Sequence, residues 1–108
     1  MRQGEVLYND LLAGVLTETD GGDYIFHYAD NYFFNTTYPA ISVTLPKNKQ
    51  QHRSSFLFPF FFNMISEGVN KKLQSRMLKI DEEDYFGLLL KTAAHETIGA
   101  ITVREIND

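Results

Sequence analysis

The chain has 108 residues, a formal net charge of −4, 44% hydrophobic residues and 22% charged residues, which predicts one folded domain over residues 1–108 and excludes a disordered chain. It is too short for a complete kinase, a Rossmann enzyme or a barrel, so most cofactor-dependent enzymes are excluded. The sequence contains no cysteine, no signal peptide and no apolar run of roughly 20 residues, which excludes disulfides and thiolate chemistry and predicts a cytoplasmic protein without a membrane partner.

The N-terminal segment predicts three strands of an antiparallel meander. Asn9-Asp10 is a short turn signal, and the DGGD sequence at residues 20–23 is a stronger one. Gly14 lies inside a strand-like run, which indicates a bulge or a close backbone approach. The strands are expected over residues 2–8, 11–18 and 24–28.

The next segment predicts a helical turn, a strand and a loop. Asp30 could cap a single helical turn that carries Tyr32, Phe33 and Phe34. Residues 41–45 (ISVTL) alternate between apolar and polar side chains, and the proline after them would end a strand. Residues 47–54 are polar and basic, which is typical of a loop.

Two helices are expected in the following segment. Ser54 or Ser55 would cap a helix that begins near Phe56, holds Pro59 in its first turn and ends at Glu67-Gly68. The helix after it would have an apolar stripe of Val69, Leu73, Met77 and Ile80, and a basic stripe of Lys72, Arg76 and Lys79.

The C-terminal segment predicts a third helix and a last strand. Asp81 would cap the helix, the acidic residues after it suit the positive end of the helix dipole, and Leu89, Leu90 and Ala93 would be buried. Residues 99–105 would form the strand. The fold class is therefore α+β: a mostly antiparallel sheet of about five strands, in the order β-β-β-β-α-α-α-β, with helices packed on one side.

Candidate chemistry is sparse along the chain. His27, His52 and His95 lack the spacing of a metal site, and the adjacent His95-Glu96 pair would be a poor chelate on a helix. The sequence contains no phosphate-binding loop, nucleophile elbow or dinucleotide fingerprint. The acidic run at residues 81–84 is typical of a helix start. We therefore expect no catalytic, cofactor-binding or metal-binding residues, no cofactor and no enzymatic activity.

Charge and aromatic residues are unevenly distributed. Residues 1–30 carry one base against six acids, residues 31–79 seven bases against one acid, and residues 80–108 two bases against seven acids. The basic block could steer a charged partner, or the three blocks could simply attract one another in the fold. Most of the nine phenylalanines and six tyrosines should form the core. A surplus among Tyr32, Phe33, Phe34, Phe56, Phe58 and Phe60 suggests a docking surface.

Several segments resemble the N-terminal subdomain of HipA-type Ser/Thr kinases. Residues 42–46 (SVTLP) are similar to the family's S-x-S-L-P, residues 60–68 (FFFNMISEG) to its F-F-x-N-L-L-P-E-G, and residues 99–103 (GAITV) to its G-A-V. Residues 7–16 are similar to its first hairpin. The chain departs from the family at Met64-Ile65-Ser66, where Leu-Leu-Pro is expected. Because the family's phosphoryl-transfer residues lie downstream of this subdomain, the resemblance implies no kinase activity.

The resemblance also implies partners. A separate copy of this subdomain resembles the small third component of split toxin–antitoxin systems. It would bind a HipA-like kinase that lacks its N-terminal subdomain, and restrain or complete it, with a HipB-like DNA-binding protein as a further suggested partner. The expected contact residues are Phe60, Asn63, Met64, Ile65, Ser66, Glu67, Gly68, Lys71, Lys72 and Arg76. Alternatively, Asn63 only caps a helix, Gly68 only supplies a positive φ, and the basic stripe is a solvated face.

A second functional hypothesis is an accessory transcription regulator that acts with a HipB-like helix-turn-helix protein on operator DNA. The basic middle block supports this hypothesis. The net charge of −4 and the lack of a recognisable recognition helix argue against direct contact with nucleic acid.

Overall fold

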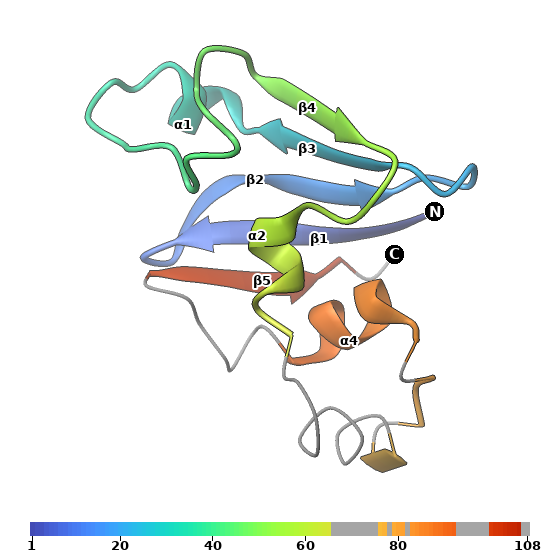
Figure 1. Cartoon of the computed structure of the whole chain (residues 1–108). Helices are drawn as coiled ribbons and strands as arrows, with labels where there is room; N and C mark the ends of the chain where they lie inside the picture. The colour runs from blue at the N-terminus through green and yellow to red at the C-terminus, as the bar shows by residue number, and fades with distance from the viewer. Residues whose placement is uncertain (66–75, 78, 82, 93–99, 107–108) are drawn as a thin grey trace.

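The computed structural model describes residues 1–65, 76, 77, 79–81, 83–92 and 100–106. Within these residues, five strands form one antiparallel sheet in the order β4-β3-β2-β1-β5 (Figure 1). The strands are β1 (Arg2–Tyr8), β2 (Leu11–Glu18), β3 (Tyr24–Tyr28), β4 (Gln51–Ser54) and β5 (Ile101–Glu105). The helices are α1 (Asp30–Phe33), α2 (Pro59–Phe62) and α4 (Tyr85–Thr92). The predicted α+β fold class is confirmed.

The β1-β2-β3 meander follows the predicted strands closely. Asn9 and Asp10 form the first turn with φ values of 48° and 67°, a conformation that Asn and Asp tolerate better than most residues. The pairing register of β1 shifts between Val6 and Leu7, opposite Gly14. A Cβ atom at Gly14 would lie 2.5 Å from the carbonyl oxygen of His27. Glycine is therefore required here by close backbone approach, as the sequence indicated.

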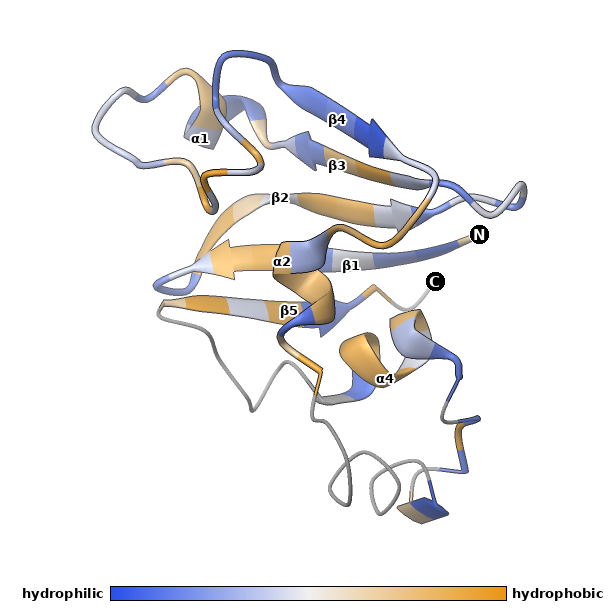
Figure 2. Ribbon diagram, viewed as in Figure 1, coloured by the Kyte–Doolittle hydropathy of each residue, from blue (hydrophilic) through white to orange (hydrophobic). Residues whose placement is uncertain are grey.

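The predicted strand at residues 41–45 is wrong, and a strand lies in the predicted loop instead. Ile41 and Leu45 are buried, but the backbone between them turns, with the Leu45 N–H donating to the carbonyl of Ser42 at 3.0 Å. Two buried residues four positions apart can therefore come from a turn as well as from a strand. The strand β4 is the hydrophilic edge of the sheet (Figure 2); its His52 is buried and lies opposite Phe26.

The helix starts differ from the predicted ones. The helical turn after residue 29 is present as α1, but Ala29 occupies its N-cap position. Phe58, not Ser54 or Ser55, precedes α2, and Pro59 is its first residue. Asp84, not Asp81, caps α4: its Oδ1 accepts the N–H of Gly87 at 3.2 Å.

The structure describes only some of the residues in the remaining helix predictions. Ile80 packs against the core, whereas Met77, which was predicted on the buried stripe, is exposed. The predicted helix end at Glu67-Gly68 lies outside the described residues, as do the other predicted stripe residues Val69, Leu73 and Lys72, and the predicted buried residue Ala93.

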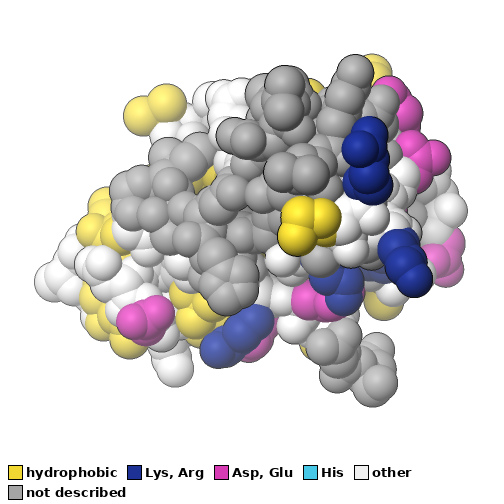
Figure 3. Space-filling view, turned by 90° about the horizontal axis from the view of Figure 1, so that it is seen from below, with side chains coloured by type: hydrophobic (Ala, Val, Ile, Leu, Met, Phe, Trp, Pro, Cys, Tyr) yellow, Lys and Arg dark blue, Asp and Glu magenta, His cyan; other side chains and the backbone are white. Residues whose placement is uncertain are grey.

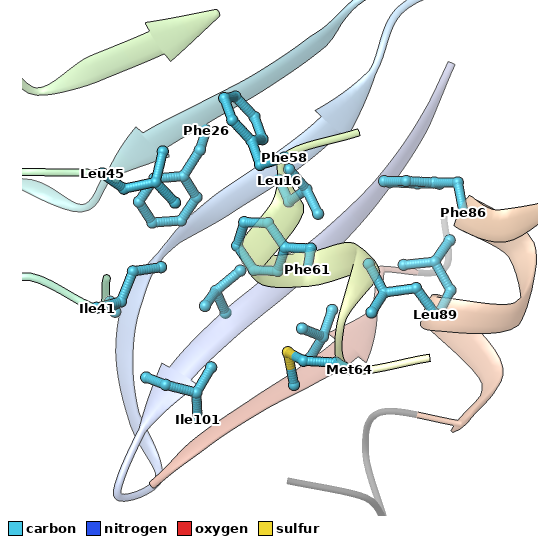
Figure 4. Close-up of a cluster of buried hydrophobic side chains, with 14 of the residues drawn as sticks. Leu16, Phe26, Ile41, Leu45, Phe58, Phe61, Met64, Phe86, Leu89 and Ile101 are labelled. Atoms are coloured by element: carbon cyan, nitrogen blue, oxygen red, sulfur yellow. The ribbon is translucent and has the colours of Figure 1, made fainter. Parts of the chain in front are cut away.

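The helices α2 and α4 cover one face of the sheet (Figure 1). Phe61 of α2 is fully buried at the centre of this layer, with its ring centroid 5.8 Å from that of Phe26. Figure 4 shows Phe86 and Leu89 of α4 turned toward the same cluster. The hydrophobic core therefore lies between the sheet and the helices, as predicted.

The other face of the sheet is more polar. Glu5, Val15, His27 and Gln51 are register partners across β1, β2, β3 and β4, and His27 and Gln51 are exposed. On β5, Arg104 pairs with Glu5 at 3.0 Å. No helix in the described part of the chain is long and apolar enough to cross a membrane.

Candidate functional site

The predicted contact residues separate into a buried group and an exposed group. Met64 and Ile65 are buried in the core, so their side chains support α2 from inside. Phe60 is half-buried with its ring 5.2 Å from that of Phe61, and Asn63 is exposed at the C-cap of α2. Arg76 is also exposed. Ser66, Glu67, Gly68, Lys71 and Lys72 lie outside the described residues, so their contact role stays a prediction.

Two aromatic rings, out of the six in the predicted surplus, are strongly exposed. Of the six candidates, Tyr32 and Phe58 are buried, Phe33 and Phe60 are half-buried, and only Phe34 and Phe56 are strongly exposed, at 72% and 78%. Leu11, Leu12 and Val43 are further exposed apolar residues that the sequence pattern did not reveal. Leu11, Leu12 and Phe34 line two hollows at one end of the sheet, and Phe56 lines a third at the other end.

The first hollow lies where the β1-β2 hairpin meets α1. It has a volume of about 210 Å³ and is lined by Leu11, Leu12, Asn31, Tyr32 and Tyr38. A second, more open hollow of about 460 Å³ shares Asn31 and extends to Phe34. We refer to the surface formed by Leu11, Leu12, Asn31, Phe34 and Tyr38 as the hairpin-end surface.

Stacked tyrosine rings hold the hairpin-end surface in place. The Tyr32 ring lies between those of Tyr28 and Tyr38, with centroid distances of 5.9 and 5.0 Å and interplanar angles of 4° and 13°. The Tyr32 hydroxyl donates to the Pro39 carbonyl at 2.7 Å. Burial raises the pKa of Tyr32 to about 12, so this hydroxyl remains a donor at neutral pH.

Two further groups fix the loop between α1 and β4. The Tyr28 hydroxyl donates to the Leu45 carbonyl and accepts the N–H of Ile41. The Lys47 ammonium donates to the carbonyls of Asn35 and Tyr38 at 2.9 and 2.8 Å, and lies 5.1 Å from the centroid of the Tyr32 ring. Burial lowers the pKa of Lys47. The loop is thus held by specific side-chain bonds to its own carbonyls, so the surface is preorganised.

An ionic cluster holds α4 against the opposite end of the sheet. Arg2 donates to both oxygens of Asp84 at 2.8 and 2.9 Å, and to Glu18 Oε1 at 2.7 and 2.9 Å. Its guanidinium also lies 5.3 Å from the centroid of the Phe86 ring. The hydrogen bond from Arg2 holds the pKa of Asp84 below its usual value. Arg2 therefore links β1, β2 and the start of α4.

The third hollow lies beside this cluster, and we refer to it as the aromatic groove. Its volume is about 270 Å³, and it is lined by Gly22, Tyr24, Ser55, Phe56, Leu57, Phe62 and Tyr85. The rings of Phe62 and Tyr85 pack edge to face with centroids 5.1 Å apart. The groove thus joins the β2-β3 turn, the segment before α2 and the first residue of α4.

The charged residues of the basic middle block are partly engaged within the fold. Arg53 forms an ion pair with Asp23 at 2.8 Å, which joins the basic block to the first acidic block. Lys47 is bonded to carbonyls, as above. On the face seen in Figure 3, the coloured Lys and Arg side chains lie next to acidic ones and form no continuous basic patch. The Arg53–Asp23 pair is thus a direct attraction between two of the blocks, whereas Lys71 and Lys72 lie outside the described residues.

The described residues do not assemble a catalytic group. No cluster of three His, Asp or Glu side chains among them could hold a metal ion. His27 is hydrogen-bonded to Gln51 on the polar sheet face, and His52 to the carbonyl of Pro46. Asp81 Oδ1 accepts the N–H of Glu83 in a turn before α4. What the described residues do offer is a set of surface hollows, two of them with mainly apolar walls.

Comparisons with known proteins identify the family. The sequence model described as the HipA N-terminal domain matches residues 4–104. An uncharacterized protein of Haemophilus influenzae is 30% identical over 107 residues, which cover 97% of this chain and 93% of the relative. A solved structure, the N-terminal domain of HipA toxin, matches with a TM-score of 0.73 and 26% identity over 100% of this chain and 95% of that one. The resemblance that the sequence segments indicated is confirmed.

Proposed function

The chain belongs to the HipA N-terminal domain family, and from this membership we propose that it is a non-enzymatic regulatory subunit of a toxin–antitoxin system. Membership of the family supports the toxin–antitoxin-related role itself. We propose more specifically that the chain binds, in trans, a HipA-like Ser/Thr kinase that lacks its own N-terminal domain, and that it restrains or completes that kinase.

One observation carries the proposal: a domain of this family exposes a preorganised apolar surface. The family match covers nearly the whole chain, and the described residues form no grouping typical of catalysis. Leu11, Leu12 and Phe34 are nevertheless exposed at 46%, 42% and 72% around hollows at one end of the sheet. Clustered exposed apolar residues of this kind mark protein-binding sites. A kinase body is the partner that the family suggests.

The stacked tyrosines add to this argument. Because Tyr32, Tyr38 and Lys47 already fix the loop beside the hairpin-end surface, little conformational entropy would be lost on binding. We therefore propose the hairpin-end surface as one contact region. The predicted set around α2 remains a second proposed region, without the buried side chains of Met64 and Ile65. Within it, Asn63 is exposed and Phe60 is half-buried.

Co-purification with a HipA-like kinase truncated to remove its N-terminal domain tests the proposal. Leu12→Asp and Phe34→Asp should each weaken the association at least tenfold, because a charge would be buried against apolar surface. Both side chains are exposed, so folding should change little. The control is Gln51→Glu, which adds a charge on the polar sheet face and should leave association unchanged. Phe60→Asp and Glu67→Arg test the second region in the same assay.

The second measurement is kinase activity. Phosphorylation by the truncated kinase, with and without this chain, should decrease if the chain restrains the kinase and increase if it completes it. An unchanged rate at saturating concentration, or a failure of the two proteins to associate, would rule the proposal out.

A further inference from the structure

The aromatic groove is a second candidate binding site, at the opposite end of the sheet from the hairpin-end surface (Figure 1). Its volume of about 270 Å³ is below the range of about 300–1,000 Å³ that is typical of small-molecule sites. It is large enough to accept one side chain. The Phe56 ring at its wall is 78% exposed, so it offers a face to an incoming group.

Carboxylates surround the groove, although its own lining is uncharged. The Tyr24 hydroxyl donates to Glu18 Oε2 at 3.2 Å, and the Tyr85 hydroxyl donates to Glu83 Oε2 at 3.0 Å. A tyrosine that donates to a carboxylate has a more electron-rich ring, and such a ring attracts cations more strongly. The groove therefore combines apolar walls with two tyrosine rings whose hydroxyls donate to carboxylates.

One carboxylate at the rim is available for a partner. Glu18 is paired with Arg2, and Asp23 with Arg53. Within the described part of the chain, Glu83 forms no ion pair; its carboxylate accepts only the Tyr85 hydroxyl. Glu83 is exposed, so a cation in the groove could approach it without breaking an internal ion pair.

The protein already contains an example of the required geometry. Arg2 places its guanidinium 5.3 Å from the Phe86 ring centroid while it bonds to Asp84 and Glu18. Arginine is suited to such sites because its planar guanidinium stacks on rings and binds carboxylates, whereas the lysine ammonium is a more strongly hydrated point charge.

We propose that the aromatic groove binds an arginine side chain presented by another protein. The aliphatic stem would lie on Leu57 and Phe62, and the guanidinium would lie over the ring of Phe56 and near the carboxylate of Glu83. This site goes beyond the kinase contact at the hairpin-end surface, and its chemistry does not depend on whether that contact exists.

A tethering experiment on the full chain tests the site directly. The chain has no cysteine, so Ser55→Cys places a single thiol in the lining of the groove. The variant is equilibrated with equal amounts of two disulfides, one carrying 2-guanidinoethanethiol and the other the neutral N-acetylcysteamine. Mass spectrometry gives the ratio of the two adducts at equilibrium. The guanidinium adduct should be favoured about three- to tenfold, as a cation–π contact and an exposed ion pair together allow.

Second substitutions assign the preference to the proposed groups. In the Ser55→Cys background, Glu83→Gln and Phe56→Ala should each reduce the ratio about two- to fivefold. Phe34→Ala, a matched change of an exposed phenylalanine at the other end of the sheet, should not alter it. A ratio near one, or a ratio that Glu83→Gln and Phe56→Ala leave unchanged, would overturn the proposal. Neither outcome bears on kinase binding, so the two proposals can fail separately.

Discussion

Replacing Arg2 with methionine should lower the free energy of unfolding by about 1.5–3 kcal/mol at pH 7. Arg2 bonds to Asp84 through two parallel hydrogen bonds and to Glu18 through two more. Each pair is partly exposed, so solvent screening limits it to about 0.5–1 kcal/mol. The contact with Phe86 contributes about 0.5–1 kcal/mol more. Methionine keeps an unbranched apolar side chain, so the loss of stability comes mainly from the removed positive charge and its hydrogen bonds.

The effect of Arg2→Met should depend on pH. Arg2 holds the pKa of Asp84 below its usual value, so the folded state binds this proton less readily than the unfolded state. The stabilisation is therefore complete above the unfolded pKa of about 3.9, and it is lost as the pH falls through the lower folded pKa. The difference in stability between the wild type and Arg2→Met should be constant from pH 5 to 7 and shrink below about pH 4.

A double-mutant cycle with Asp84→Asn isolates the pairwise energy. Asparagine keeps an oxygen that can accept the N–H of Gly87, so the cap of α4 is preserved. Urea denaturation of the four proteins at pH 7 should give a coupling of about 1 kcal/mol between Arg2 and Asp84. A coupling below about 0.3 kcal/mol, within the usual error of additivity, would refute the argument. So would a stability difference that is the same at pH 3 and pH 6.

Two further substitutions test the loop and the sheet. Tyr28→Phe should cost about 1.5–3 kcal/mol in urea denaturation, because the Ile41 N–H and the Leu45 carbonyl both lose their partner; a loss under about 0.5 kcal/mol would show that the loop is not held this way. Gly14→Ala should cost about 1–3 kcal/mol, because its Cβ would meet the His27 carbonyl at 2.5 Å. The matched control Gly21→Ala, where the nearest atom lies at 3.8 Å, should be nearly neutral, and equal losses would contradict the steric argument.

The sequence predicts this fold where burial alternates along a strand. In β3, Phe26 and Tyr28 are buried and His27 is exposed. The sequence shows this alternation of aromatic and polar residues, which is typical of a strand. In the edge strand β4, the residue that faces the core is His52, between exposed Gln51 and Arg53. A buried histidine gives no apolar signal, so the sequence pattern predicts a loop here instead of a strand.

Helix starts and exposed apolar residues were harder to predict, for different reasons. Asp81 and Asp84 are both good capping residues in one acidic run, and only the path of the chain decides that Asp84 accepts the Gly87 N–H. Leu11 and Leu12 read as ordinary strand residues, because their exposure depends on where α1 and its loop lie. The aromatic surplus did predict exposed rings, since a small core cannot bury them all. It could not say that the rings would be those of Phe34 and Phe56.

The two ends of the sheet are organised by different forces, and this separation bears on function. Tyrosine stacking around Tyr32 and hydrogen bonds from Lys47 to two carbonyls fix the hairpin-end surface. Ion pairs between Arg2 and two carboxylates fix the start of α4 beside the aromatic groove. Salt and pH act on the second set of contacts far more than on the first. One end can therefore hold an apolar partner under conditions that loosen the other. The two proposed contacts would therefore respond to different conditions, and this difference can be measured by repeating both binding assays across salt concentration and pH.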